Sequence, residues 1–185
     1  MPALAVWTPE DGLLGALAPL GLASASRGPT LVIDLDEDGP RYPGKVSLAG
    51  LVKEGPRLRD LRPDRRGVAV LRNGGVGATA ASEVVEALIE GWGRTVLRLP
   101  PRRRVVVPMP VVPVRLLIPG TLFEPPEGPA VLQATPAFAR LTGSGIRLPV
   151  PARATVAALI RGQTPVPSDR WVRAWRRVWE APWGR

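Results

Sequence analysis

TLVIDL, residues 30–35, has the aliphatic and β-branched composition of a buried strand, and a turn at 36–40 follows it. Further strands are predicted at 3–7, 67–72, 95–99 and 131–134, and a short extended run ends at Val150-Pro151. Helices are predicted at 13–26, 80–90, 152–161 and 168–181, and residues 46–52 are predicted to form a short helix or a turn. Because strands that alternate with helices are typical of βαβ units, the sequence predicts an α/β fold with a mostly parallel sheet flanked by helices.

Prolines are expected to interrupt two of these segments. Pro19 should kink or restart the helix at 13–26. Residues 105–118 are mostly apolar but contain three prolines, which predicts one or two strands, or edge strands, with breaks. No long linker divides the chain, so we expect an α/β domain at 1–167 and a C-terminal helix with its tail at 168–185.

Composition limits the chemistry of the chain. The 185 residues include no Cys and no His, which excludes disulfides, cysteine nucleophiles and histidine bases and disfavours a zinc site. The net charge of +9 favours an anionic partner, although an Arg-rich composition from a GC-rich genome explains it equally well. The sequence has no signal-peptide pattern and no apolar run of ~18 residues, so a cytoplasmic protein is expected.

Residues 3–40 combine a strand, a glycine-containing loop (10–17), a helix, Arg27-Gly28 and the text LVIDLDEDGP (31–40). In this order they resemble the MinD/ParA family, the deviant Walker-A ATPases that position division sites, chromosomes and appendages. RRGVAVL (65–71) is similar to the third strand of the family, and EVVEALIEGWGRTVLRLPP (83–101) is similar to the helix and strand that carry its Walker B aspartate. The resemblance implies a P-loop NTPase-like fold; a generic α/β domain is the alternative interpretation.

The residues with which this family acts on nucleotide are replaced. A P-loop binds phosphate through backbone N–H groups and a lysine, while a hydroxyl and an acidic residue hold Mg²⁺. By the resemblance, Glu10 and Gly15 stand at the two lysine positions, Ala16 and Leu17 at the hydroxyl positions, and Arg98 at the Walker B aspartate. The degenerate nucleotide-site positions are Glu10, Asp11, Gly12, Gly15, Ala16, Asp34, Asp36 and Arg98. The resemblance therefore implies a pseudo-ATPase without catalytic residues, cofactor or metal.

Two other loops have glycine spacings similar to phosphate loops. Residues 39–45 satisfy G-x-x-x-x-G-K, but Ser47 comes one place late and Pro40 and Pro43 remove N–H groups. Residues 73–79 copy the glycines of the deviant loop without its lysine. We interpret the glycines and prolines of both as ordinary loop residues, and a weak hydrolase using Lys45 in the 39–47 loop is the third functional hypothesis.

The predicted C-terminal helix has an N-cap at Ser168 and a stop at Pro182. Its residues at helical spacing form an apolar stripe and a basic face: Trp171, Val172, Trp175, Val178 and Trp179 against Arg173, Arg176 and Arg177. Three interpretations follow, and we place packing on the chain's own domain first. An anionic membrane, as in MinD, and the groove of a partner protein rank equally behind it.

Further basic residues lie in loops, either as solvated surface or as a phosphate footprint. The candidate anion-binding residues are Lys45, Arg57, Arg59, Arg62, Arg65, Arg66, Arg102, Arg103 and Arg104. The preferred hypothesis is a non-catalytic MinD/ParA-like protein that binds itself or an active paralogous ATPase, in the cytoplasm or at the inner face of the membrane, and helps to position or assemble a cellular machine. The second hypothesis is a non-specific nucleic-acid-binding protein that uses the Arg clusters.

Overall fold

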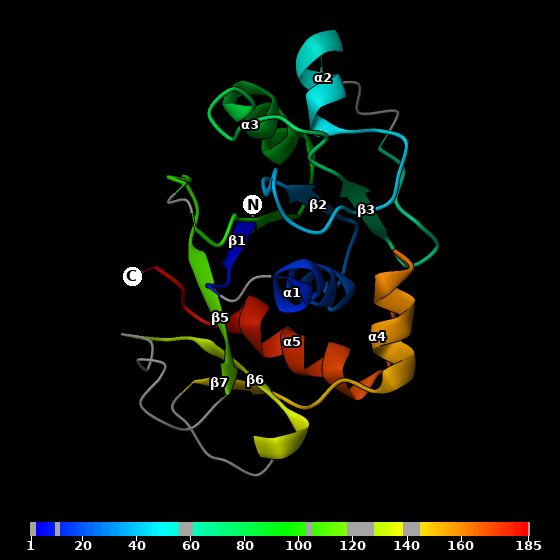
Figure 1. Ribbon diagram of the computed structural model, residues 1–185, viewed down its shortest axis with the longest axis vertical. Helices are drawn as coiled ribbons and strands as arrows, with labels where there is room; N and C mark the ends of the chain where they lie inside the picture. Colours follow the sequence, from blue (N-terminus) through cyan, green and yellow to red (C-terminus); the bar gives the residue numbers. More distant parts are fainter. Residues whose placement is uncertain are drawn as a thin grey trace.

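The computed structural model describes residues 3–9, 12–55, 61–102, 105–117, 128–138 and 145–184 (Figure 1). Its strands are β1 (Ala3–Trp7), β2 (Thr30–Asp34), β3 (Val68–Leu71), β4 (Thr95–Arg98), β5 (Val111–Leu117), β6 (Val131–Ala134) and β7 (Ile146–Leu148). They form one sheet in the order β3-β2-β4-β1-β5-β6-β7, and every described pairing is parallel. The predicted α/β fold with a parallel sheet is confirmed, and it is compatible with a P-loop-like architecture.

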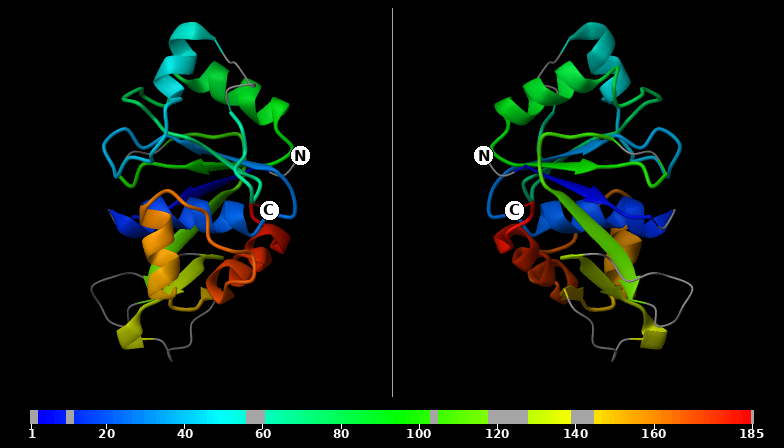
Figure 2. Two further views of the ribbon diagram at one scale, coloured as in Figure 1. Left: turned by 90° about the vertical axis from the view of Figure 1, so that its right-hand side faces the viewer. Right: turned by 90° about the vertical axis from the view of Figure 1, so that its left-hand side faces the viewer.

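Helices cover both faces of this sheet (Figure 2). α2 (Leu48–Glu54) and α3 (Ser82–Gly91) lie on one face, and α1 (Leu13–Ser24), α4 (Arg153–Ile160) and α5 (Arg170–Glu180) lie on the other. A short 3-10 helix, η2 (Pro136–Phe138), follows β6. Within the described residues, no helix is both long enough and apolar enough to cross a membrane.

The central strands are buried along their whole length. Every residue of β2 and of β4 is buried, including the polar ones. A parallel sheet that is covered on both faces is expected to have near-continuous apolar strands rather than alternating ones. The apolar run at 30–35 reflects this burial. The two polar residues that end these strands, Asp34 and Arg98, therefore need partners inside the protein.

α1 is buried between the sheet and α5. All its residues from Gly15 to Ser24 are buried, and the helix continues without interruption through Pro19. The expected restart at Pro19 is therefore wrong. The contacts on both sides of α1 stabilise it in spite of the proline, which by itself removes one helical hydrogen bond.

β5 lies within the 105–118 segment, so the prediction of a strand there is confirmed, and because β5 is an interior strand the edge-strand alternative is wrong. It pairs with β1 on one side and with β6 on the other. Pro113 is opposite Trp7, the last residue of β1, and the pairing with β6 begins at Val114. The missing N–H of Pro113 therefore falls where one ladder ends and the next begins, which explains why an interior strand tolerates it.

α5 packs its apolar stripe onto α1 and the sheet. Trp171, Val172, Trp175 and Val178 are buried, and the two indoles meet edge to face with centroids 5.6 Å apart. The packing interpretation is thus the one that agrees with this structure. The membrane and groove interpretations, which need this stripe to be exposed, are not supported. The N-cap is Asp169 rather than Ser168, because the Asp169 carboxylate accepts hydrogen bonds from the N–H groups of Trp171 and Val172.

Candidate functional site

The sheet brings the carboxyl ends of β1, β2 and β4 together. β4 lies between β2 and β1, with Arg98 opposite Asp34 on one side and opposite Val6 on the other. In parallel α/β sheets, ligands bind beyond the carboxyl ends of the strands. The loops that follow these three strands therefore define the candidate functional site.

Arg98 is the centre of this site. Its guanidinium donates a 2.6 Å hydrogen bond to Asp36 and a 2.6 Å hydrogen bond to the carbonyl of Pro40. It also lies 3.3 Å from the Asp34 carboxylate. Arg98 and Asp34 are 2% and 1% exposed, so this is a fully buried ion pair. The Arg98 guanidinium thus lies at the position that the resemblance assigns to the Walker B aspartate.

Both carboxylates are also held by backbone groups. The N–H of Asp36 donates to the Asp34 side chain, and the N–H of Gly39 donates to the Asp36 side chain, each at 3.1 Å. Burial raises the pKa of Asp34 to about 6, although Arg98 and the Asp36 N–H lower it. Desolvation therefore affects the pKa of Asp34 more than the ion pair with Arg98 does.

Tyr42 completes the group, which we call the Arg98 cluster (Arg98, Asp34, Asp36 and Tyr42). Its buried ring lies under the Arg98 guanidinium at 5.4 Å, and its hydroxyl donates to the carbonyl of Ala16 in α1 at 2.7 Å. Burial raises the pKa of the Tyr42 phenol well above its usual value, against the opposing effect of Arg98. The phenol therefore stays protonated and keeps the 36–44 loop attached to α1.

The 39–45 loop is closed by these contacts. Pro40 is bound by Arg98, and a side chain at Gly39 would place its Cβ 2.4 Å from an Arg98 nitrogen. Lys45 is exposed. The interpretation of this segment as a loop agrees with the structure, in which Pro40 and Tyr42 contact the buried Arg98.

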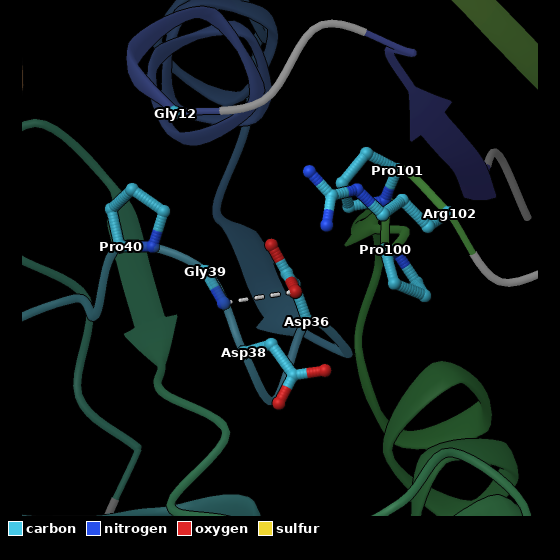
Figure 3. Close-up of a pocket in the computed structure, with 8 residues that line it drawn as sticks. All are labelled: Gly12, Asp36, Asp38, Gly39, Pro40, Pro100, Pro101 and Arg102. Carbon is cyan, nitrogen blue, oxygen red and sulfur yellow. Dashed lines mark hydrogen bonds between the residues drawn. The ribbon is translucent and has the colours of Figure 1, made fainter.

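A cavity of about 660 Å³ opens above the Arg98 cluster. Its lining comes from the loops after all three strands: Gly12, Asp36, Asp38, Gly39, Pro40, Pro100, Pro101 and Arg102 (Figure 3). The Arg102 side chain extends from the β4 loop toward Asp36. Two carboxylates and a guanidinium thus line the same cavity, which suits a ligand or partner that carries both positive and negative charges.

The predicted nucleotide-site residues fall into three groups. Asp34, Asp36 and Arg98 meet in the Arg98 cluster, and Gly12 lines the cavity with Asp36. Gly15 and Ala16 are buried within α1. Glu10 and Asp11 lie outside the described residues.

The loop at 73–79 is organised by Asn73. The Asn73 amide oxygen accepts hydrogen bonds from the N–H groups of Gly75 and Val76, and its nitrogen donates to the Asp34 carbonyl. This segment therefore supports the end of β2 and agrees with the interpretation as a loop.

The predicted basic residues that the structure describes come from separate segments of the chain. Arg62, Arg65 and Arg66 are exposed, Arg102 lines the cavity, and Arg57, Arg59, Arg103 and Arg104 lie outside the described residues. Arg173, Arg176 and Arg177 are exposed on α5, and Trp179 is half-buried. No sequence pattern pointed to the hydrogen bonds of Tyr42 and Asn73, or to that of Arg94 with the Ser26 hydroxyl, because these partners are distant in sequence.

The described residues contain no group of three or more carboxylates suited to a metal ion. Asp34, which ends β2, and Asp36, two residues beyond it, are both paired with Arg98. No protein-family model matches the chain, and no curated protein matches it in sequence.

Proposed function

We propose that this chain is a non-catalytic MinD/ParA-like protein that acts by binding, in the positioning or assembly of a cellular machine. The observation that carries the proposal is the buried Arg98 ion pair beyond β2 and β4. A nucleotide site at this place needs acidic residues available for Mg²⁺ and donors for phosphate. Here Asp34 and Asp36 form ion pairs with the Arg98 guanidinium instead.

The replaced loop residues support the same proposal. Gly15 and Ala16, at positions where the family has a lysine and a hydroxyl, are buried in α1, and the Ala16 carbonyl is bonded to Tyr42. The cavity beside Gly12 keeps charged groups of both signs. Under the proposal, this cavity contacts a protein partner, either a second copy of the chain or an active paralogous ATPase.

Nucleotide turnover and self-association test the proposal together. We expect no Mg²⁺-dependent ATP hydrolysis, and sedimentation velocity profiles that are the same with and without Mg²⁺-ATP. Hydrolysis by the wild-type chain that is lost in Lys45→Ala would contradict the proposal and support a hydrolase that uses the 39–47 loop. Lys45 is exposed, so this variant should fold normally.

Non-specific nucleic-acid binding is the second candidate function. Arg62, Arg65 and Arg66 are exposed together around a turn that Asp64 holds by accepting hydrogen bonds from the N–H groups of Arg66 and Val68. Neutralising phosphates releases counterions, so log affinity should fall with log salt by roughly 0.9 per phosphate contact on duplex DNA. A salt slope that is unchanged in Arg65→Ala with Arg66→Ala would eliminate this turn as the binding surface.

A further inference from the structure

A second charged hollow lies at the amino ends of the strands. Arg27 precedes β2 and Arg94 directly precedes β4, so in a parallel sheet both lie at the edge opposite the Arg98 cluster. The hollow has a volume of about 160 Å³ and is lined by Ala25, Arg27, Arg94, Arg176, Trp179 and Glu180. We call it the amino-end hollow. Its size suits a single oxyanion group rather than a whole nucleotide.

Three separate elements supply its guanidinium groups. Arg27 comes from the α1–β2 turn, Arg94 from the α3–β4 turn and Arg176 from α5. Glu180 is the one carboxylate among the described lining residues, and it lies 3.6 Å from Arg27. Both members of this pair are largely exposed, at 81% and 64%, so their attraction is weak. The described lining therefore carries a formal charge of +2.

Arg94 is held in place before any ligand arrives. It donates a 2.9 Å hydrogen bond to the Ser26 hydroxyl, and its guanidinium lies over the Trp179 ring at 5.8 Å. Trp179 is itself fixed by a 2.9 Å hydrogen bond to the carbonyl of Leu22. A guanidinium ordered in advance loses less conformational entropy on binding an anion.

Hydrogen bonds to the carbonyls at the end of α1 do not occupy Arg27 or Arg94, whose partners are Glu180 and the Ser26 hydroxyl. Cations often lie near a helix C-terminus because its carbonyls lack partners, and α1 ends at this hollow. However, the carbonyls of Gly21, Leu22 and Ala23 already accept hydrogen bonds from the N–H groups of Ala25 and Ser26. Arg176 has no hydrogen-bond or ion-pair partner among the described residues. Donor capacity therefore remains for a ligand.

We propose that the amino-end hollow binds a phosphate-like dianion, either inorganic phosphate or the terminal phosphate of a monoester. The +2 charge of the lining complements such a group, which carries about −1.5 to −2 near pH 7. Guanidinium forks bind phosphate oxygens in pairs, and three forks can surround one tetrahedral anion. A phosphodiester has one negative charge and fewer free oxygens, so it fits less well. This site is independent of the function proposed above.

Calorimetric titration of the full chain at pH 7.5 tests the proposal, with inorganic phosphate, phenyl phosphate and dimethyl phosphate as probes. We expect the first two to bind and dimethyl phosphate to bind at least tenfold more weakly. Stronger binding of phenyl phosphate than of inorganic phosphate assigns a monoester as the ligand, and the reverse assigns the free anion. Failure of both dianions to bind would overturn the proposal.

Substitutions locate the binding. Arg94→Ala and Arg176→Ala should each weaken it roughly tenfold or more, because each removes charge-assisted hydrogen bonds. Arg173→Ala is the matched control, because Arg173 is exposed on α5 but does not line the hollow. The affinity of this variant for the phosphate probes should stay within about twofold of the wild-type value. Arg176 is exposed, so its variant keeps the test valid if Arg94→Ala fails to fold.

Glu180→Gln tests the part played by Arg27, with which this carboxylate pairs. It removes the carboxylate that repels the ligand and competes for Arg27, so affinity should rise several-fold. Equal losses in Arg94→Ala, Arg176→Ala and Arg173→Ala, or weaker binding in Glu180→Gln, would overturn the assignment of the site.

Discussion

Arg98 and Asp34 illustrate how much a single buried charge depends on its partners. Each is almost completely excluded from solvent, and the guanidinium connects Asp34, Asp36 and Pro40. A buried ion pair contributes little net stability compared with apolar residues of similar volume, but removal of one partner leaves an uncompensated charge. The residue-scale predictions follow from this asymmetry.

Arg98→Met should lower the free energy of unfolding by roughly 3–5 kcal/mol, because two carboxylates then lose their cation. Urea denaturation measures the loss. The control is the triple variant Arg98→Met, Asp34→Asn, Asp36→Asn, which removes the charges together and should recover a large part of the stability. An Arg98→Met variant as stable as the wild type would show that the Arg98 cluster does not behave as a buried ion pair.

Because burial raises the pKa of Asp34, we expect this residue to make a pH-dependent contribution to the free energy of unfolding. Its folded-state pKa of about 6 lies above the ordinary value of 3.8, so the folded state binds more protons between these two values. The Asp34 contribution to stability is therefore full below about pH 4 and is lost as the pH rises through 6. Between pH 4 and pH 6.5, the wild type should therefore lose more unfolding free energy than the Asp34→Asn variant. Identical pH slopes in the two proteins would contradict the raised pKa.

At the scale of elements, the contact between α1 and α5 depends on a close approach at Gly21. A Cβ at this position would lie 2.4 Å from the Trp171 ring and 2.5 Å from the Trp175 indole nitrogen. The glycine lets the two helices approach, and both indoles then complete the core. This contact explains why the aromatic stripe of α5 is buried.

Gly21→Ala should lower the free energy of unfolding by roughly 1–3 kcal/mol, since the indoles must move to admit the methyl group. Gly50→Ala in α2 is the matched control, because its Cβ meets only the Ser47 hydroxyl at an ordinary 3.4 Å. That control should be stabilised by about 0.4–1 kcal/mol through the better helix propensity of alanine. Thermal unfolding followed by circular dichroism compares them. A stable Gly21→Ala variant would contradict the close packing of α1 and α5.

At the scale of the whole molecule, α5 belongs to the same core as α1 and the sheet. Trp171, Val172, Trp175 and Val178 share a buried cluster with α1 and with strands from both halves of the sheet. The indole of Trp171 also donates a 2.7 Å hydrogen bond to Gln133 in β6. α5 therefore packs against α1, which joins β1 to β2, and also against the last strands of the sheet.

A chain that ends at Pro167 should therefore lose cooperative thermal unfolding and bind the hydrophobic dye ANS, because the outer side of α1 becomes exposed. Vesicle co-sedimentation provides the second measurement. The truncated chain should misfold, and the full chain should not use its tryptophan stripe to bind anionic vesicles. A cooperative transition in the truncated chain, with vesicle binding only by the full chain, would restore the membrane-anchor interpretation.

The local pattern of the sequence was sufficient for the fold class and for most of the secondary structure. The apolar runs predicted β1, β2, β3, β4 and β6, and the helical periodicity predicted α3 and α5, because these signals depend on neighbours a few residues apart. The same locality explains the errors. The restart at Pro19 and the edge position of the 105–118 segment depended on contacts that a proline alone does not specify.

The sites were decided by tertiary structure. Asp34 and Arg98 are 64 residues apart in sequence, and they meet only because β4 is inserted between β1 and β2. Arg94 and Ser26 are likewise 68 residues apart, and Trp179 reaches Leu22 across 157 residues. The sequence by itself determined which segments are strands or helices and which residue types are available. Strand order determined which charges neutralise one another, because Coulombic and hydrogen-bonding partners are set by distance in space rather than along the chain.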